Sequence, residues 1–83
     1  MSSRSNLLIQ LGLIISQRRK TLGLSQEKLG ELAGLHRTYI SDVERGTKNL
    51  TIITFDKICQ ALNTTPSSIF EQLKRSNQSE SKF

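Results

Sequence analysis

Apolar residues recur at helical spacing along most of the chain. Between Asn6 and Leu22, apolar side chains fall on one face together with Arg19, at steps of three and four residues. The apolar members of this face are Leu8, Leu11, Ile15 and Leu22. This spacing is typical of an amphipathic helix, and Gly23 follows where a left-handed residue would end it. The sequence therefore predicts a first helix over residues 6–22.

The starts of three further helices share one pattern. An apolar residue precedes a capping residue, and a second apolar residue occupies the fourth helical position, which is the spacing of a hydrophobic staple. The three sets are Leu24-Ser25 with Leu29, Leu35-His36 with Ile40, and Leu50-Thr51 with Phe55. We predict helices over residues 26–33, 37–45 and 52–62. The second has the least favoured cap, because histidine is not a preferred residue at that position.

A fifth helix is predicted near the end of the chain. Asn63 is placed to end the fourth helix, and Thr65-Pro66 then offers a capping hydroxyl followed by proline at the first helical position. This helix should end near Arg75. Residues 1–5 are expected to be flexible and the polar residues 76–83 to be a disordered tail. The predicted fold is a compact all-α domain of five helices over residues 6–75.

The second and third predicted helices form a distinct unit, because only a short turn containing Gly34 joins them. Such a pair is a helix-turn-helix, whose second helix enters the major groove of DNA. The residues expected to face inward are Leu29, Leu32, Ala33, Ile40 and Val43. The residues expected on the outward side of the second helix are Arg37, Thr38, Ser41, Asp42 and Arg45.

Charge and composition narrow the function. Twelve Lys and Arg against seven Asp and Glu give 83 residues a net charge of +5, which favours a polyanionic partner but is also typical of a plain solvated surface. One His and one Cys, without metal-ligand spacing or a phosphate-binding glycine loop, predict no enzyme, no metal and no cofactor. Cys59 lies in an apolar run and is expected to be a core thiol of a cytoplasmic protein. The apolar run 7–15 is too short for a membrane span, which needs about 20 residues.

A family resemblance adds to this interpretation. The segments Leu24 to Leu29, Ala33-Gly34 and Tyr39 to Gly46 resemble the lambda-repressor and Cro-like helix-turn-helix family over about residues 8–74. Residues 36–41 with 49–51 are most similar to the controller proteins of restriction-modification systems. The resemblance implies a homodimer that binds a palindromic operator in double-stranded DNA as an activator or repressor, with no small-molecule ligand. A phage or plasmid repressor and a protein-interaction module of the antitoxin or coactivator type remain alternatives.

The resemblance also implies roles for single residues. Arg37 and Thr38 would read base edges, on guanine and on a thymine methyl respectively. Ser41 and Asp42 lie one turn further, where Asp42 either accepts from cytosine N4 or repels phosphate and shapes specificity. The residues implied to contact phosphate are Gln26, His36, Tyr39, Arg45, Lys48 and Asn49. Alternatives are a helix cap for His36, a half-buried ring for Tyr39 and a solvated charge for Lys48.

Three further roles complete the predictions. The resemblance suggests an internal ion pair between Arg19, on the inner side of the first helix, and Glu44, on the inner side of the third. The proposed dimer interface consists of Ile69, Phe70 and Leu73, unless these residues belong wholly to the monomer core. Glu27 and Glu31 correspond to positions that contact RNA polymerase in the resembling phage repressors, which implies the polymerase sigma subunit as a partner of this chain. A solvated helix face is the alternative.

Overall fold

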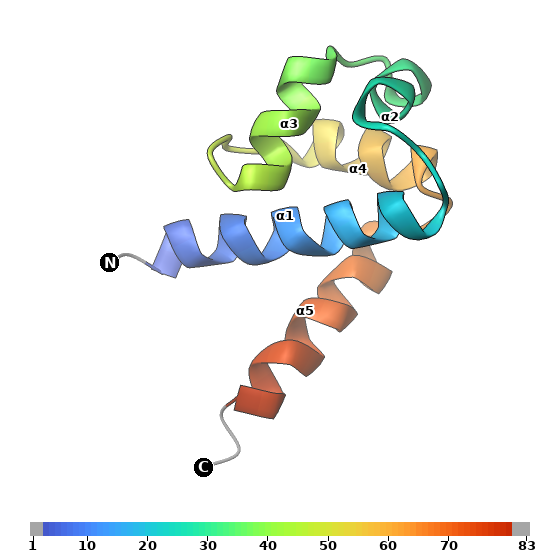
Figure 1. Cartoon of the computed structure of the whole chain (residues 1–83). Helices are drawn as coiled ribbons and strands as arrows, with labels where there is room; N and C mark the ends of the chain where they lie inside the picture. Colours follow the sequence, from blue (N-terminus) through green and yellow to red (C-terminus); the bar gives the residue numbers. More distant parts are fainter. Residues whose placement is uncertain (1–2, 81–83) are drawn as a thin grey trace.

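The computed structural model describes residues 3–80, and over that range it consists of five α-helices joined by short turns (Figure 1). The helices are α1 (Ser3–Thr21), α2 (Gln26–Ala33), α3 (Arg37–Arg45), α4 (Ile52–Ala61) and α5 (Pro66–Glu80). No strand occurs among these residues. The predicted five-helix, all-α architecture is therefore confirmed.

The outer ends of the first and last helices differ from the prediction. Helix α1 begins at Ser3 rather than Asn6, and α5 continues to Glu80 instead of ending near Arg75. Residues 3–5 and 76–80, expected to be a flexible start and a disordered tail, are thus helical. Neither stretch contains the glycine or proline that would interrupt a helix. The remainder of these two predictions, residues 1–2 and 81–83, lies outside the described residues.

The predicted caps set the starts of the inner helices. The backbone N–H of Lys28 donates to Ser25 Oγ at 2.9 Å, and that of Thr54 donates to Thr51 Oγ1 at 3.1 Å. At α3 the backbone N–H of Thr38 donates to His36 Nδ1 at 3.0 Å, so the imidazole is a real cap. Each bond satisfies a helical N–H that has no partner within the helix. The local sequence thus defines where α2, α3 and α4 begin.

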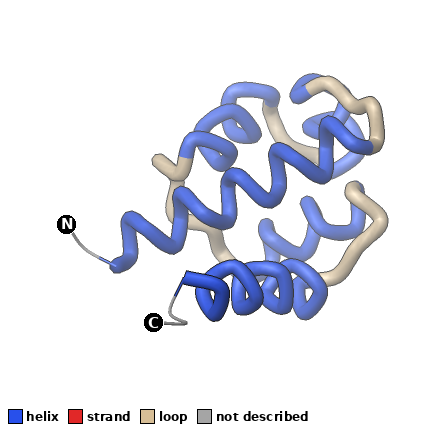
Figure 2. Tube along the Cα trace, turned by 60° about the horizontal axis from the view of Figure 1, so that its bottom comes forward, coloured by secondary structure: helices blue, strands red, loops and turns tan. Residues whose placement is uncertain are grey.

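Helix α1 runs between α3 and α5, and α2 packs on α3 and α4, as the two views of the chain show (Figures 1 and 2). The side chains that are almost completely buried come from all of these helices: Ile15, Leu29, Ile40, Ile58, Cys59, Leu62 and Ile69. Burial, with a smaller contribution from Asp56, raises the pKa of the Cys59 thiol to about 11. Cys59 is therefore a neutral core residue, as predicted.

Two leucines of the predicted apolar faces lie at the surface. Leu32 is 53% exposed, so the prediction that it faces inward is wrong, and Leu22, which was placed on the apolar face of the first helix, is 40% exposed. Helix α2 packs on α3 and α4, and its buried residues are Leu29, Gly30 and Ala33. Leu22 follows the last residue of α1, beyond the helical face to which it was assigned.

Two glycines bring α3 close to its neighbours. A Cβ at Gly12 of α1 would lie 2.5 Å from the Glu44 carbonyl oxygen, and one at Gly30 of α2 would lie 2.5 Å from the Leu35 carbonyl oxygen. Both distances are shorter than any ordinary contact with a methyl group. The absence of side chains at Gly12 and Gly30 therefore fixes how closely α3 and the turn before it approach the rest of the domain.

Arg18 links α1 to the end of α4 through two hydrogen bonds. Its Nε donates to the Leu62 carbonyl oxygen at 2.9 Å and its Nη2 to the Asn63 carbonyl oxygen at 2.8 Å. Asn63 has a φ of +57°, so it ends α4 in the left-handed conformation that its sequence position predicted. Arg18 thus binds carbonyl groups at the end of α4, which the sequence alone did not indicate.

Candidate nucleic-acid interface

A buried ion pair positions α3 against two other helices. Glu44 Oε2 accepts from Arg19 Nε at 2.6 Å, and Glu44 Oε1 accepts from Arg19 Nη2 at 3.0 Å. The amide of Gln26, at the start of α2, donates to the same Oε1 at 3.0 Å. Arg19 Nη1 also donates to the Leu24 carbonyl oxygen at 2.8 Å. This network, here called the brace, confirms the predicted Arg19–Glu44 pair and links α1, α2 and α3.

The environment of the brace keeps both charges in place. Burial by itself would raise the pKa of Glu44, but the hydrogen bonds from Arg19 and Gln26 outweigh it, and the pKa lies below its usual value. The hydrogen bond to Glu44 raises the pKa of Arg19 despite the opposing effect of burial. Both groups are therefore ionised at neutral pH. An ionised, fully hydrogen-bonded pair holds α3 in one orientation.

The other side of α3 is polar and open. Ile40 is fully buried and Val43 is 3% exposed, so they form the inner face of the helix. Arg37 and Thr38 are exposed at its N-terminal end. The positions that share this outward face by helical spacing are Arg37, Thr38, Ser41, Asp42 and Arg45. The structure thus brings together the four predicted base-reading residues and Arg45.

Three side chains on this outward face bind one another. Arg45 Nη1 donates to Ser41 Oγ at 2.7 Å, and Arg45 Nη2 donates to Asp42 Oδ1 in an ion pair. This group, here called the clasp, was not predicted. The i, i+3 and i, i+4 spacings of its members were the available signal, because side chains at these separations are neighbours on a helix.

The predicted phosphate-contacting residues surround α3, but their side chains differ in what they already bind. Gln26 belongs to the brace and His36 caps α3. Tyr39 is half-buried and packs on the core, and Lys48 Nζ lies 5.4 Å from the centre of its ring. This cation–π contact places the ammonium group beside α3. Asn49 is exposed in the segment that follows.

The prediction for a dimer interface on α5 needs correction. Ile69 is fully buried and Leu73 is 8% exposed, so both belong to the monomer core, because α5 packs on α1 and α4. Phe70 is 44% exposed, with its ring centre 5.4 Å from that of Phe55. Ile69 and Leu73 therefore offer almost no surface to a second subunit, whereas Phe70 does.

Sequence reasoning missed two apolar residues at the start of α4. Ile52 and Ile53 are 66% and 68% exposed. The signal was their position before Phe55, Ile58 and Cys59, which already supply the inner face of α4. Within residues 6–75, the exposed large apolar side chains of α4 and α5 are Ile52, Ile53 and Phe70, and these three residues are here called the α4–α5 patch.

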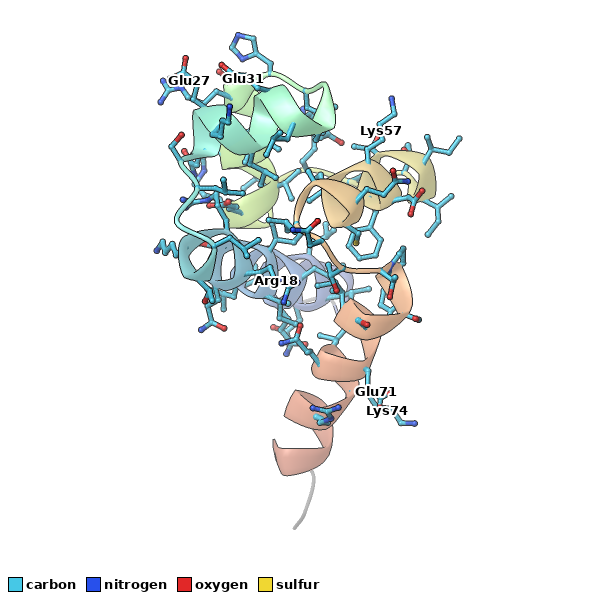
Figure 3. The ribbon with its side chains drawn as sticks, turned by 90° about the vertical axis from the view of Figure 1, so that its right-hand side faces the viewer. Arg18, Glu27, Glu31, Lys57, Glu71 and Lys74 are labelled. Carbon is cyan, nitrogen blue, oxygen red and sulfur yellow. The ribbon has the colours of Figure 1, made fainter. Side chains whose placement is uncertain are left out.

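The two predicted polymerase-contacting residues lie at the surface of α2. Glu27 and Glu31 are both exposed, and Glu31 Oε1 lies 3.5 Å from Lys28 Nζ. Figure 3 shows Glu27 and Glu31 together at one end of the molecule, far from Glu71 and Lys74 on α5. Leu32, exposed on the same helix, adds an apolar side chain to this region.

Among the side chains that the structure describes, those of residues 6–75, no group of three His, Cys, Asp or Glu is arranged to hold a metal ion. No helix in this part of the chain has both the length and the hydropathy needed to cross a bilayer. A polar hollow of about 520 Å³ lies between Arg18 of α1 and Arg75 of α5.

Known proteins resemble this chain over most of its length. Residues 15–69 match the family model described as helix-turn-helix. The control protein C.BamHI from Bacillus amyloliquefaciens is 40% identical over 68 residues, which cover 81% of this chain and 84% of that protein. The restriction-modification controller protein C.AhdI from Aeromonas hydrophila has 37% identity and a TM-score of 0.73, with 75% of this chain and 94% of that chain covered. The C.Esp1396I controller protein, solved as a tetramer with its natural 35 base-pair operator, has 36% identity and a TM-score of 0.77, with 83% and 91% covered.

Proposed function

Because the chain belongs to the lambda-repressor and Cro-like family of helix-turn-helix regulators, we propose that it controls a restriction-modification system by binding a palindromic operator as a homodimer. One observation carries this proposal: the brace holds α3 by its inner side while the outward face presents Arg37 and Thr38. A polar helix face of this kind fits the major groove.

The outward face supports direct reading of bases. Arg37 is the residue suited to guanine, because its guanidinium donates two parallel hydrogen bonds to O6 and N7. Thr38 offers a methyl group to thymine, and Ser41 and Asp42 lie one turn further along the same face. These four residues are the base-contacting set that we propose.

Phosphate contacts flank this face. Arg45, Lys48 and Asn49 lie at or beyond the end of α3, while Gln26 and His36 lie at the starts of α2 and α3. Since the Gln26 amide is engaged by Glu44, the backbone N–H groups at the start of α2 would make its phosphate contact. Tyr39 completes the set through its hydroxyl. Such contacts set the register of the protein on DNA, and the base contacts set its sequence preference.

Dimerisation follows from the size of the motif. One helix-turn-helix covers a few base pairs, and two half-sites about 34–36 Å apart give the affinity that regulation requires. The α4–α5 patch of Ile52, Ile53 and Phe70 is the proposed interface, and it replaces Ile69 and Leu73. The tetrameric operator complex of C.Esp1396I supports assembly on DNA. Replacing Ile52 and Ile53 by serine should lower the sedimentation coefficient, measured by sedimentation velocity, from that of a dimer to that of a monomer. The control substitution Ile9→Ser on α1 should leave the dimer intact.

Activation is the finer part of the proposal. Glu27 and Glu31 are exposed on α2 and would contact the sigma subunit of RNA polymerase. Reversing both charges should abolish activation in a reporter assay while operator binding persists. Unchanged transcription would show that these residues are a solvated helix face. The site of action is cytoplasmic DNA, and the proposal includes no small-molecule ligand.

The decisive experiment is selection of binding sites from random duplexes. The protein should enrich a palindrome whose half-sites are one helical turn apart. Binding to that palindrome should weaken with salt, at a slope of about −0.9 per phosphate neutralised. A protein-interaction module would enrich no sequence, and that result would overturn the proposed function.

A further inference from the structure

The clasp places an acid on the surface that faces DNA. Asp42 shares the outward face of α3 with Arg37 and Thr38, and its carboxylate is paired with Arg45. An unpaired carboxylate facing a phosphate backbone would repel it. Arg45, which is also bonded to Ser41, supplies the compensating charge within the protein. The outward face therefore carries one fewer available positive charge than its arginines suggest.

The clasp also limits what Arg45 can bind. Its two terminal nitrogens are each engaged, one by Ser41 Oγ and one by Asp42 Oδ1. A phosphate contact by Arg45 must compete with these partners. The clasp competes least with phosphate for Arg45 where DNA offers Asp42 another hydrogen-bond donor. In the major groove, the donor that a carboxylate binds is the N4 amino group of cytosine.

We propose that Asp42 is a specificity-determining residue that acts through Arg45. On unrelated DNA, Asp42 keeps the guanidinium on α3, and Arg45 neutralises no phosphate. On the operator, a cytosine amino group binds Asp42, and Arg45 becomes free for the backbone. A correct base is thereby coupled to an additional phosphate contact. This inference rests on the proposed function, because it requires an operator.

The chain offers a matched control for this idea. Lys28 and Glu31 on α2 are also an exposed ion pair at i, i+3 spacing. Removing the charge of Glu31 changes the net charge of the protein by the same amount as removing that of Asp42. Glu31→Gln therefore measures how the loss of one negative charge alters DNA binding, and Asp42→Asn combines that effect with the loss of the clasp.

The test measures binding to the selected operator and to a scrambled duplex of equal length across a range of salt concentrations. Asp42→Asn should strengthen binding to the scrambled duplex and steepen its salt slope by about 0.9, because Arg45 then reaches one more phosphate. The ratio of the Asp42→Asn affinity to the wild-type affinity for the scrambled duplex should therefore fall roughly 3.5-fold between about 50 and about 200 mM salt. Preference for the operator should decrease. Glu31→Gln should change neither the slope nor the preference.

A second set of variants, made in an Arg45→Gln protein, distinguishes the release of Arg45 from a plain repulsion between Asp42 and the phosphates. In an Arg45→Gln protein, Asp42→Asn should no longer steepen the slope, since no guanidinium is left to release. An equal change with and without Arg45 would overturn the inference, as would identical behaviour of Asp42→Asn and Glu31→Gln. A wild-type protein that enriches no operator would instead contradict the proposed function. Far-UV circular dichroism of each variant checks that α3 and the other helices are intact.

Discussion

Helix α3 carries two ion pairs of opposite character. In the brace, the side chains of Arg19 and Glu44 are 11% and 6% exposed, and they connect residues 25 positions apart. In the clasp, the side chains of Arg45 and Asp42 are 61% and 25% exposed, three positions apart on one helix. The same chemistry thus occurs on the inner and the outer side of one nine-residue helix.

The two pairs differ in how far their charges are exposed to solvent. Charges removed from water are costly when separated, so the brace has one stable arrangement and fixes α3. Charges in water exchange partners easily, because solvent screens them and an exposed pair contributes little. The clasp is therefore able to change partners without disturbing the fold. The inner face of α3 is bound to the rest of the domain, and the outward face is the one that we propose for DNA recognition.

Breaking the brace should have the largest effect. Glu44→Ala leaves Arg19 buried without its partner and removes the acceptor of Gln26, which should lower the free energy of unfolding by about 3–5 kcal/mol. Urea or thermal unfolding followed by circular dichroism measures this loss. Glu31→Ala, which removes an exposed acid, should change stability by less than about 0.5 kcal/mol. Equal effects of the two substitutions would contradict the structural role of Glu44.

Acid should weaken the same pair, less severely than the substitution does. The pKa of Glu44 in the folded protein lies below its usual value, which is about 4.3 in an unfolded chain. The stabilisation is therefore complete above the unfolded value and is lost as the pH falls through the lower folded value. Urea unfolding between about pH 5 and about pH 2 should show this decrease. In Glu44→Gln, the free energy of unfolding should depend less on pH. If its pH dependence instead ran parallel to that of the wild type, other carboxylates would be responsible for the decrease.

Changing the outward face should alter binding rather than folding. Arg37→Ala should cost about 1–3 kcal/mol of operator binding and relax the preference at one base pair. Lys48→Ala should weaken all sequences alike and make the salt slope shallower by about 0.9. Gel shifts with matched and mismatched duplexes distinguish the two patterns. Loss of thermal stability in Arg37→Ala would place this residue in the core network instead.

Breaking the clasp should have the smallest effect on stability. Asp42→Asn should change the free energy of unfolding by less than about 1 kcal/mol, since exposed ion pairs contribute little. The same unfolding experiment serves as the measurement. A loss as large as that of Glu44→Ala would show that the clasp holds α3 and would remove the contrast between its two faces.

Particular residues show how far sequence reasoning reached. The caps Ser25, His36 and Thr51 were predicted because each bond joins residues two or three positions apart. Leu32 was assigned wrongly, and Ile69 follows the alternative of a core position, because periodicity identifies an apolar face but not which neighbouring helix covers it. Arg18 binds carbonyl groups 44 and 45 positions away, a contact that no local spacing indicates.

The amino-acid sequence by itself determined the number of helices, most of their ends and the outward residues of α3, because these depend on interactions within about one helical turn. The tertiary structure decided that Ile69 and Leu73 lie in the core and that Ile52 and Ile53 remain exposed. These outcomes depend on which surfaces pack together. They arise only when segments distant in sequence compete for the same buried volume.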